Sequence, residues 1–333
     1  MAKARVTPMK IVNDLWGART ALALAAAVDL DVFTAIAQGK KTAADVAKSL
    51  NVSQRGIERL LDSLTGIGYL TKRGSRYGLT PTADTFLVRT KHTYVGAMAK
   101  ESQMTLPMWM QLADVIRNGK PAATVNAEEG RKFFPELVKA IFPMTYNGAL
   151  GLVHSLPKAK LKKISRVLDV AAGSGAWSLP FAQHIPNARV TAVDYPEVTP
   201  VTREYARVFG VAERYDYLEG DLRQLDFGSQ QYDVVILGHI IHSEGEKWGR
   251  DLINKSYKAL KPGGMLVIAE MVPNDSRTGP VFPLLFGVMM VLATEEGDVF
   301  TMAQYKQWLK QAGFKGVKLV KVEAPSPLIV ATR

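Results

Sequence analysis

The clearest chemical signature in the sequence is a run of small residues, Ala171-Ala172-Gly173-Ser174-Gly175, which follows the run Val167–Val170, apolar except for Asp169. The apolar run predicts a buried strand, and the small residues predict a tight turn into a helix. In an open α/β sheet, ligands bind beyond the carboxyl ends of the strands, where small residues let a ligand approach the backbone. The motif Asp169–Gly175 therefore predicts a site for a nucleotide-like ligand.

Acidic residues at the ends of the next two predicted strands limit the class of ligand that the site can bind. Asp194 ends the second strand, where a carboxylate is well placed to accept hydrogen bonds from two ribose hydroxyls. Asp221 follows the third strand and can accept a hydrogen bond from an adenine amino group. A dinucleotide fingerprint requires a third glycine three residues after Gly175, and Ser178 stands there, which disfavours a nicotinamide cofactor.

Two histidines, His239 and His242, follow a further predicted strand, and Glu244 lies close by. The group invites a metal interpretation, but no other residues have ligand spacing. An imidazole titrates near neutral pH and can act as a general base. A histidine at a strand end can also be held by backbone hydrogen bonds alone, so the residues by themselves leave its role open.

The elements that must position these residues begin near Arg166. Short β-branched runs alternate there with helical segments, which predicts βαβ units and a mainly parallel sheet. The predicted strands are 166–170, 189–193, 214–219, 232–237 and 265–270.

The first hundred residues predict a helical region with one short hairpin. The segment 20–37 is apolar nearly all round, which predicts a helix buried in a core or against a partner subunit. Thr42 and Ser53 are candidate N-caps of the next two helices, and the Gly74-Ser75 tip predicts a two-stranded wing. This winged helix-turn-helix raises the alternative of a DNA-binding regulator, although its second helix carries few basic side chains.

A second helical stretch runs from about Lys100 to Leu156, with breaks near Gly119-Lys120-Pro121 and Glu129-Gly130. It is rich in Met and aromatic residues, which suit either a core or an adaptable apolar pocket. The 333 residues suggest two domains, and the absence of cysteine excludes disulfides and thiolate sites. The net charge of +11 is spread along the chain and is a weak indication of partners. We see no secretory signal and no apolar run of membrane-spanning length, which favours a cytoplasmic protein.

Four motifs, Leu168–Gly175, Asp194, Gly220-Asp221 and Leu260–Gly264, resemble the ordered motifs of class I S-adenosylmethionine-dependent methyltransferases. Together with the winged-helix region and the length, the whole chain resembles the plant-type and bacterial small-molecule O-methyltransferases. This family includes caffeate, acetylserotonin and hydroxyneurosporene methyltransferases. The resemblance implies S-adenosylmethionine as cofactor, S-adenosylhomocysteine as product, and a homodimer formed largely through the N-terminal helices. One departure is Ala171, where the family usually has glycine and a methyl group should be tolerable.

The resemblance also implies the fold class: an α/β, Rossmann-like methyltransferase sheet at the C-terminus with a mostly helical winged-helix dimerisation domain before it. We expect the dimerisation domain over 1–100, a helical linker and substrate lid over 101–160, and the cofactor-binding domain over 161–333. The expected partners are a small-molecule acceptor and a second copy of the chain, with no nucleic acid and no membrane.

In the resembling family, His242 matches the histidine that removes the proton of the acceptor hydroxyl, and Glu270 matches a glutamate that orients it. Three departures concern their surroundings. The family commonly has Asp-Trp where this chain has Ser243-Glu244, an acid where Val299 stands, and sometimes a Lys or Arg at the position of Gly238.

We therefore expect methyl transfer to a hydroxyl, phenolic by preference, of a small and largely apolar molecule. The alternatives are methylation of carbon, nitrogen or sulfur, and a non-methylating descendant that still binds the cofactor. The predicted cofactor-binding residues are Asp169, Gly173, Ser174, Gly175, Asp194, Tyr195, Gly220, Asp221, Leu222, Gly238 and His239. The predicted substrate-binding residues are Met144, Tyr146, Phe286, Met290 and Thr294.

Overall fold

The computed structural model of the chain describes residues 7–91, 93–125, 132, 134–322, 324 and 326–333. Contacts divide the chain into two compact units, one up to Leu106 and one from Pro107 to Arg333.

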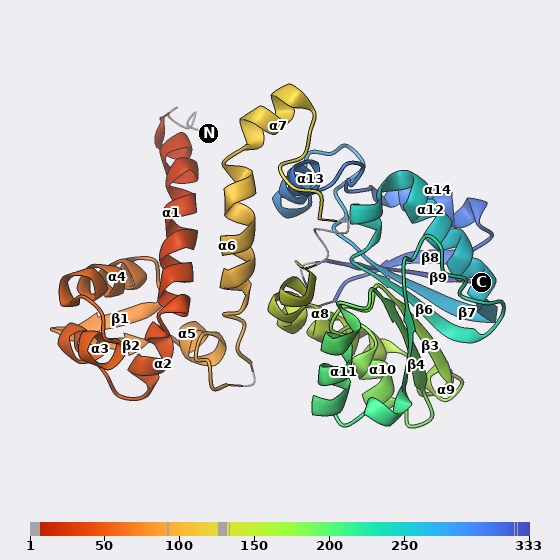
Figure 1. The fold of residues 1–333 in the computed structure, drawn as a ribbon, viewed down its shortest axis with the longest axis horizontal. Coiled ribbons are helices and arrows are strands. Elements are labelled where there is room, and N and C mark those ends of the chain that lie inside the picture. The colour runs from red at the N-terminus through yellow and green to blue at the C-terminus, as the bar shows by residue number, and fades with distance from the viewer. Residues whose placement is uncertain (1–6, 92, 126–131, 133, 323, 325) are drawn as a thin grey trace, which may run out of the picture. The chain divides into compact units, whose positions relative to one another are not determined.

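The N-terminal unit is helical with one two-stranded hairpin (Figure 1). Thr42 caps one helix in a reciprocal pair of hydrogen bonds with Asp45, and Ser53 caps the next by accepting from the N–H of Gly56 at 3.3 Å. The predicted caps and the predicted wing are therefore confirmed. The elements are α1 (Met9–Asp29), α2 (Val32–Ala37), α3 (Ala43–Leu50), α4 (Gln54–Gly66), β1 (Leu70–Arg73), β2 (Arg76–Leu79), α5 (Pro81–Phe86) and α6 (Met98–Trp109), which runs past the boundary.

The apolar segment 20–37 forms parts of two helices, so the prediction of one continuous helix is wrong. The chain turns at Leu30-Asp31, where Asp31 adopts a left-handed conformation with φ of 61°. Aspartate tolerates this region better than most residues because its short side chain bonds locally. Here its Oδ1 accepts a hydrogen bond from Thr34 Oγ1 at 2.6 Å, in the first turn of α2.

Most of α1 is exposed within its own unit. Leu15 and Trp16 are 68% and 61% exposed, whereas the buried residues of α1 lie near its C-terminal end. By length and composition alone, α1 could also cross a membrane, contrary to the expectation that no apolar segment is long enough, and 17% of its most apolar 18 residues are buried. The all-round burial expected of this apolar helix is therefore not reached inside the described unit, which leaves the partner-subunit interpretation.

The helix-turn-helix part of this unit pairs several of its cations internally. Arg59 lies 3.1 Å from Glu58 and 3.2 Å from Asp62, and Lys72 of the wing lies 2.5 Å from Asp62. A groove-reading surface would instead present such cations to phosphates.

The C-terminal unit is a seven-stranded sheet with helices on both faces (Figure 1). Its strands are β3 (Arg166–Val170), β4 (Arg189–Asp194), β5 (Tyr215–Glu219), β6 (Tyr232–Gly238), β7 (Leu260–Ala269), β8 (Lys315–Val320) and β9 (Leu328–Thr332). Its helices, after the end of α6, are α7 (Leu112–Asn118), α8 (Phe134–Ser155), α9 (Lys158–Leu161), α10 (Leu179–His184), α11 (Thr199–Val208), α12 (Ile241–Ala259), α13 (Val281–Ala293) and α14 (Met302–Gln311), with a short 3₁₀ turn at Ala212–Arg214.

The strand order β5-β4-β3-β6-β7-β9-β8 places β3 beside β4 on one side and β6 on the other. Strands β3 to β7 run parallel, and β9 runs antiparallel between β7 and β8. The chain leaves β3 and β6 in opposite directions, so their carboxyl ends form the switch point at which open α/β sheets bind ligands. The five predicted strands and the mainly parallel sheet are confirmed, whereas β8 and β9 are not among the predicted strands.

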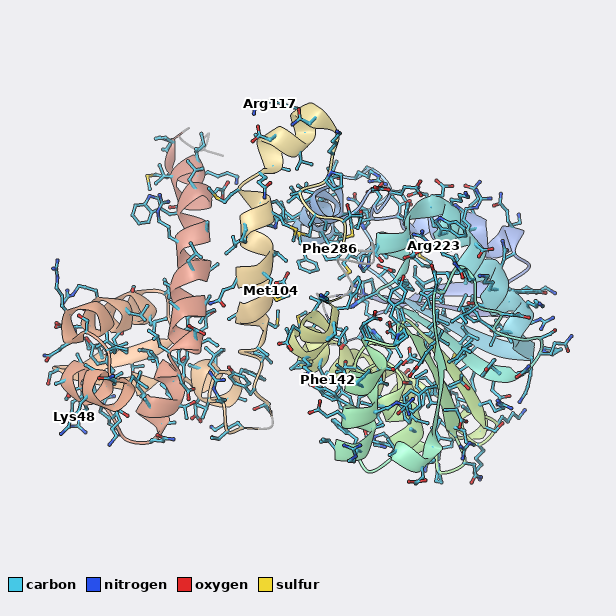
Figure 2. All side chains as sticks on the ribbon, viewed as in Figure 1. Lys48, Met104, Arg117, Phe142, Arg223 and Phe286 are labelled. Atoms are coloured by element: carbon cyan, nitrogen blue, oxygen red, sulfur yellow. The ribbon has the colours of Figure 1, made fainter. Side chains whose placement is uncertain are left out.

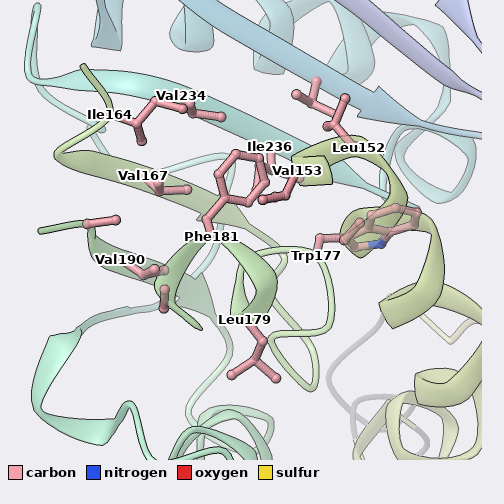
Figure 3. Close-up of a cluster of buried hydrophobic side chains, with 14 of the residues drawn as sticks. Leu152, Val153, Ile164, Val167, Trp177, Leu179, Phe181, Val190, Val234 and Ile236 are labelled. Carbon is pink, nitrogen blue, oxygen red and sulfur yellow. The ribbon is translucent and has the colours of Figure 1, made fainter. Parts of the chain in front are cut away.

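Alternate residues of the strands supply two buried layers. Val167 and Val234 face α8 and α10, where Leu152 and Phe181 pack against them (Figure 3). Leu168, the next residue of β3, faces the opposite layer with α12 and α14. This two-sided burial fixes which way the ends of β3 and β6 point.

Helix α8 belongs to the core of the sheet. Its residues Leu152 and Val153 are buried in the same layer as α10, so this part of the predicted region 101–160 packs into the C-terminal unit. Gly119 ends α7 with φ of 65°, which confirms the predicted break there. The predicted break at Glu129-Gly130 lies outside the described residues.

Candidate active site

Three left-handed residues fold the small-residue turn after β3. Ala171, Gly173 and Gly175 have φ of 56°, 58° and 73°, a region that suits glycine and strains alanine. The N–H of Gly175 donates to the carbonyl of Ala172 at 2.7 Å, and Ser174 is buried between them. The left-handed conformation at this position thus explains why the family usually has glycine where this chain has Ala171.

Gly173 and Asp194 join the loops that follow β3 and β4. The N–H of Gly173 donates to Asp194 Oδ2 at 2.7 Å, and the N–H of Tyr195 donates to Oδ1 at 2.8 Å. A Cβ on Gly173 would lie 2.9 Å from Val138, so a side chain there would collide. Burial raises the pKa of Asp194 to about 6, against the opposite effect of the two N–H groups. Each carboxylate oxygen keeps a further lone pair that can accept from a ligand hydroxyl.

Asp169 is fully buried beneath the same turn. One oxygen accepts from Ser178 Oγ, which also lies 3.0 Å from the hydroxyl of Tyr215. The other oxygen, Oδ1, has no hydrogen-bond partner among the described residues. Burial, with a further contribution from the charge of Asp194, raises the pKa of Asp169 to about 7. Ser178, which stands where a dinucleotide fingerprint would have its third glycine, therefore donates a hydrogen bond to the carboxylate of Asp169.

The chain after β5 reaches the same edge of the sheet. The N–H of Gly220 donates to the carbonyl of Asp194 at 3.0 Å, and Asp221 Oδ1 accepts from the N–H of Arg223 at 2.9 Å. Leu222 between them is buried in the core. The predicted residues of the three loops are thus brought together at adjacent strand ends.

Trp177 fills the space over Gly238 at the end of β6. A Cβ on Gly238 would lie 2.2 Å from the indole, which explains why no side chain stands there. His239 follows with φ of 58°, and its ring lies edge-on to Trp177 at 5.3 Å. Its Nε2 lies 2.8 Å from Ser326 Oγ, and burial lowers its pKa to about 4, so the ring is neutral at pH 7. Sequence reasoning missed Trp177 and Ser326.

His242 is held by a buried carboxylate. Its Nδ1 lies 2.7 Å from Glu270 Oε2, and its backbone N–H donates to Oε1 at 3.2 Å. Burial alone would raise the pKa of Glu270, but the charge and hydrogen bonds of His242 outweigh it and lower that pKa. With Nδ1 engaged, the imidazole keeps Nε2 to accept a proton. His239 and His242 therefore have separate partners, Ser326 and Glu270.

The altered motif after His242 has its own structure. Glu244 is 5% exposed, and its Oε2 accepts from Arg223 Nε at 2.9 Å. Gly245 has φ of 75°, and a Cβ there would lie 2.5 Å from the carbonyl of Glu296, so the chain bends within α12. Val299, where the family has a second acid, is buried and apolar.

Helix α13 borders His242 on one side. The ring of Phe286 lies edge-on to that of His242 at 4.8 Å, and Figure 2 labels Phe286 on this helix. Met290 is buried one turn later. Thr294 ends the helix, donating to the carbonyl of Met290 at 2.7 Å and accepting from the N–H of Gly297 at 2.9 Å. Thr294 also lines a cavity of about 310 Å³.

The two predicted substrate residues on α8 lie differently. Met144 is half-buried. The hydroxyl of Tyr146 donates to Gln183 Oε1 at 2.6 Å, and its ring lies 5.4 Å from Phe142 and 5.2 Å from Phe209. The structure thus brings Phe286 to His242 and places Tyr146 in an aromatic cluster over α10 and α11.

Two domain families match the chain: the O-methyltransferase dimerisation domain over residues 15–89 and the O-methyltransferase domain over residues 109–315. The chain is 28% identical over 331 residues to the tetracenomycin polyketide synthesis 8-O-methyl transferase of Streptomyces glaucescens, covering 98% of this chain and 96% of that protein. It is 29% identical over 322 residues to the 3-hydroxy-5-methyl-1-naphthoate 3-O-methyltransferase of Streptomyces sahachiroi, covering 95% and 91%.

Solved structures share the fold over nearly the whole chain. A Nostoc punctiforme protein assigned to the O-methyltransferases matches with a TM-score of 0.89 and 31% identity, covering 99% of this chain and 100% of that one. Human N-acetylserotonin methyltransferase, in complex with S-adenosylmethionine, matches with a TM-score of 0.82 and 24% identity, covering 100% and 99%. The predicted fold class is confirmed.

The strain at Ala171 predicts that Ala171→Gly stabilises the protein. Glycine relieves about 1–2 kcal/mol of left-handed strain, partly offset by its greater freedom in the unfolded chain. We expect a net gain of about 0.5 kcal/mol in the free energy of unfolding, measured by urea denaturation. The matched control, Ala172→Gly, removes a buried methyl without relieving such strain and should destabilise. A loss of stability in Ala171→Gly would overturn the strain argument.

The raised pKa of Asp169 predicts a pH-dependent stability without cofactor. The folded state keeps the proton up to about pH 7, whereas the unfolded chain loses it near the ordinary value of 3.8. Stability therefore falls as pH rises between these values. Asp169→Asn cannot ionise, so its stability relative to wild type should increase from pH 5 to pH 8 in urea unfolding. A difference that stays constant over this range would contradict the assignment.

Proposed function

This chain belongs to the O-methyltransferase family and is an S-adenosylmethionine-dependent methyltransferase, and from this premise we propose that it methylates a hydroxyl of a small, largely apolar aromatic molecule. The observation that carries the proposal is the buried pair of His242 and Glu270 beside the ring of Phe286.

In the proposed reaction, His242 takes the proton of the acceptor hydroxyl at Nε2. Glu270 accepts the hydrogen bond of Nδ1, which fixes the tautomer and stabilises the imidazolium that forms. Glu270 is suited to this role because its lowered pKa keeps it ionised at neutral pH. The edge of Phe286 restricts the face from which an acceptor can approach.

The acids at the strand ends fit the cofactor. Asp194 has lone pairs left for two ribose hydroxyls, and Asp169 Oδ1 is a buried polar atom that no described residue hydrogen-bonds. We propose that these residues, with Gly173, Gly175 and the other predicted cofactor residues, bind S-adenosylmethionine. The sulfonium of the bound cofactor supplies an activated methyl group, so the chain mainly positions the acceptor and removes its proton.

Two observations favour a flat aromatic acceptor. Phe286 and Met290 give α13 an apolar side next to His242, and soft or aromatic walls suit planar ligands. By name, relatives in Streptomyces act on a naphthoate and in tetracenomycin polyketide synthesis. A phenolic hydroxyl on a fused-ring molecule is therefore the acceptor class that we propose.

We also propose that the active form is a homodimer that covers α1. The dimerisation-domain match begins at residue 15, next to the exposed pair Leu15 and Trp16. An exposed apolar helix of this kind is buried most simply against a second copy. A cytoplasmic location, expected from the sequence, stays a prediction.

His242→Gln should lower kcat on a hydroxynaphthoate acceptor by about 10²–10⁴-fold, because the proton would have no base. A thiol acceptor ionises more readily and should lose less. Calorimetry with S-adenosylhomocysteine should show near wild-type affinity, since the cofactor loops are untouched. The control His154→Gln changes an exposed residue at the end of α8. Near wild-type turnover by His242→Gln would rule out the base.

Leu15→Glu should convert the dimer to a monomer, because a carboxylate would be buried in an apolar interface. The measurement is light scattering coupled to size exclusion. Lys48→Glu, on the exposed side of α3 (Figure 2), is the matched control and should stay dimeric. A dimeric Leu15→Glu would show that α1 is not the interface.

A further inference from the structure

An ion pair with one buried partner, Glu244, links the two ends of the site. Arg223 stands two residues after Asp221, and its Nε donates to Glu244 Oε2 at 2.9 Å. The side chain of Glu244 is 6% exposed and that of Arg223 is 39% exposed. Glu244 stands where the family commonly has tryptophan, and Arg223 is not among the predicted site residues.

The two residues belong to different elements: Arg223 to the loop after β5, and Glu244 to the first turn of α12. Arg223 also donates its backbone N–H to Asp221 Oδ1 and so sets the orientation of that carboxylate. Glu244 lies on the first turn of α12, two residues after His242. The ion pair therefore fastens the loop that carries Asp221 to the turn that carries the proposed base.

The guanidinium of Arg223 has an acidic and an aromatic neighbour, Glu244 and Trp248. Its carbon lies 5.0 Å from the ring centre of Trp248. Burial alone would lower the pKa of Arg223, but the hydrogen bond and charge of Glu244, with smaller contributions from Asp221 and Tyr195, raise it. Glu244 is the tightest of these partners, and burial raises its pKa while Arg223 opposes the shift.

The orientation leaves part of the guanidinium available. Arg223 uses Nε for Glu244, and its terminal nitrogens make no hydrogen bond to any residue in the described stretches of the chain. Asp221, whose carboxylate accepts a hydrogen bond from the backbone N–H of Arg223, is the residue expected to accept from the adenine amino group of the cofactor. A planar guanidinium presents a fixed fork of donors to ring nitrogens and can stack flat on a π face, whereas a lysine ammonium is a point charge without a planar face.

We propose that Arg223 is a positioning and specificity residue for the adenine ring, held in place by the buried carboxylate of Glu244. Asp221 accepts from the 6-amino group, and Arg223 donates to the acceptor edge of the same ring or stacks on it. This inference rests on the proposed cofactor site at Asp194. It adds to that site the pair Arg223 and Glu244, of which Glu244 stands where the family commonly has tryptophan.

The test measures binding of S-adenosylhomocysteine and of its inosine analogue, in which a carbonyl replaces the 6-amino group. Wild type should prefer the adenosine compound. Arg223→Gln should weaken its binding about tenfold, the usual effect of losing a charge-assisted contact, and should reduce the preference over the inosine analogue. The KM for S-adenosylmethionine should rise in parallel, with kcat changed less than about twofold.

Two further variants keep the test decisive. Arg223→Lys retains a cation beside Glu244, so it should fold where Arg223→Gln does not, and it should still lose base discrimination because the planar group is gone. Arg203→Gln is the matched control: Arg203 pairs with Glu219 at 3.2 Å and lies over the ring of Tyr217 at 3.6 Å, but this pair is exposed. Its binding and discrimination should equal those of wild type.

The outcomes separate the two proposals. If Asp194→Ala leaves S-adenosylhomocysteine binding unchanged, the proposed cofactor site itself is wrong. If Asp194→Ala abolishes binding while both Arg223 variants keep wild-type affinity and base preference, only the role of Arg223 is overturned. A lower melting temperature of Arg223→Gln with unchanged base preference would show a purely structural ion pair and would also overturn it.

Discussion

The hydrogen bond from the N–H of Gly173 to Asp194 holds together the two loops at the proposed cofactor end of the site. It requires β3 and β4 to pair in parallel register, so that both loops leave the sheet at one edge. It also requires the left-handed conformation of Gly173, whose carbonyl accepts from Thr202 at 2.6 Å on the other side. The burial of Asp169 and Asp194, and hence their raised pKa values, follows from this closed arrangement.

Two buried acids of the site have pKa values that are shifted in opposite directions. Asp169 and Glu270 are both buried, yet the pKa of Asp169 is raised and that of Glu270 is lowered. The difference is the partner: a serine hydroxyl and a neighbouring acid surround Asp169, whereas His242 faces Glu270. A polar ligand group can thus complete the first site, while the second is already complete and needs only an acceptor with a proton to lose.

Regular features could be predicted from the sequence because they depend on local patterns. Strand periodicity, caps such as Thr42, and glycine at forced conformations such as Gly173 each have a local cause. Features that depend on distant partners could not. Trp177 matters only because Gly238 lies beneath it, and Arg223 only because Glu244 is buried beside it. The prediction of one helix over 20–37 is wrong because Asp31 adopts a left-handed conformation that separates two helices within the apolar run.

The packing of Trp177 over Gly238 also constrains how this sequence can change. A Cβ at Gly238 would lie 2.2 Å from the indole, so the basic residue that some members of the family have there cannot be introduced by one substitution. Trp177 would have to become smaller first, which would leave a void beside Gly148 and the ring of His239 until the second change filled it. Volume therefore constrains the order of the two substitutions, because a side chain introduced at position 238 first would overlap the indole of Trp177.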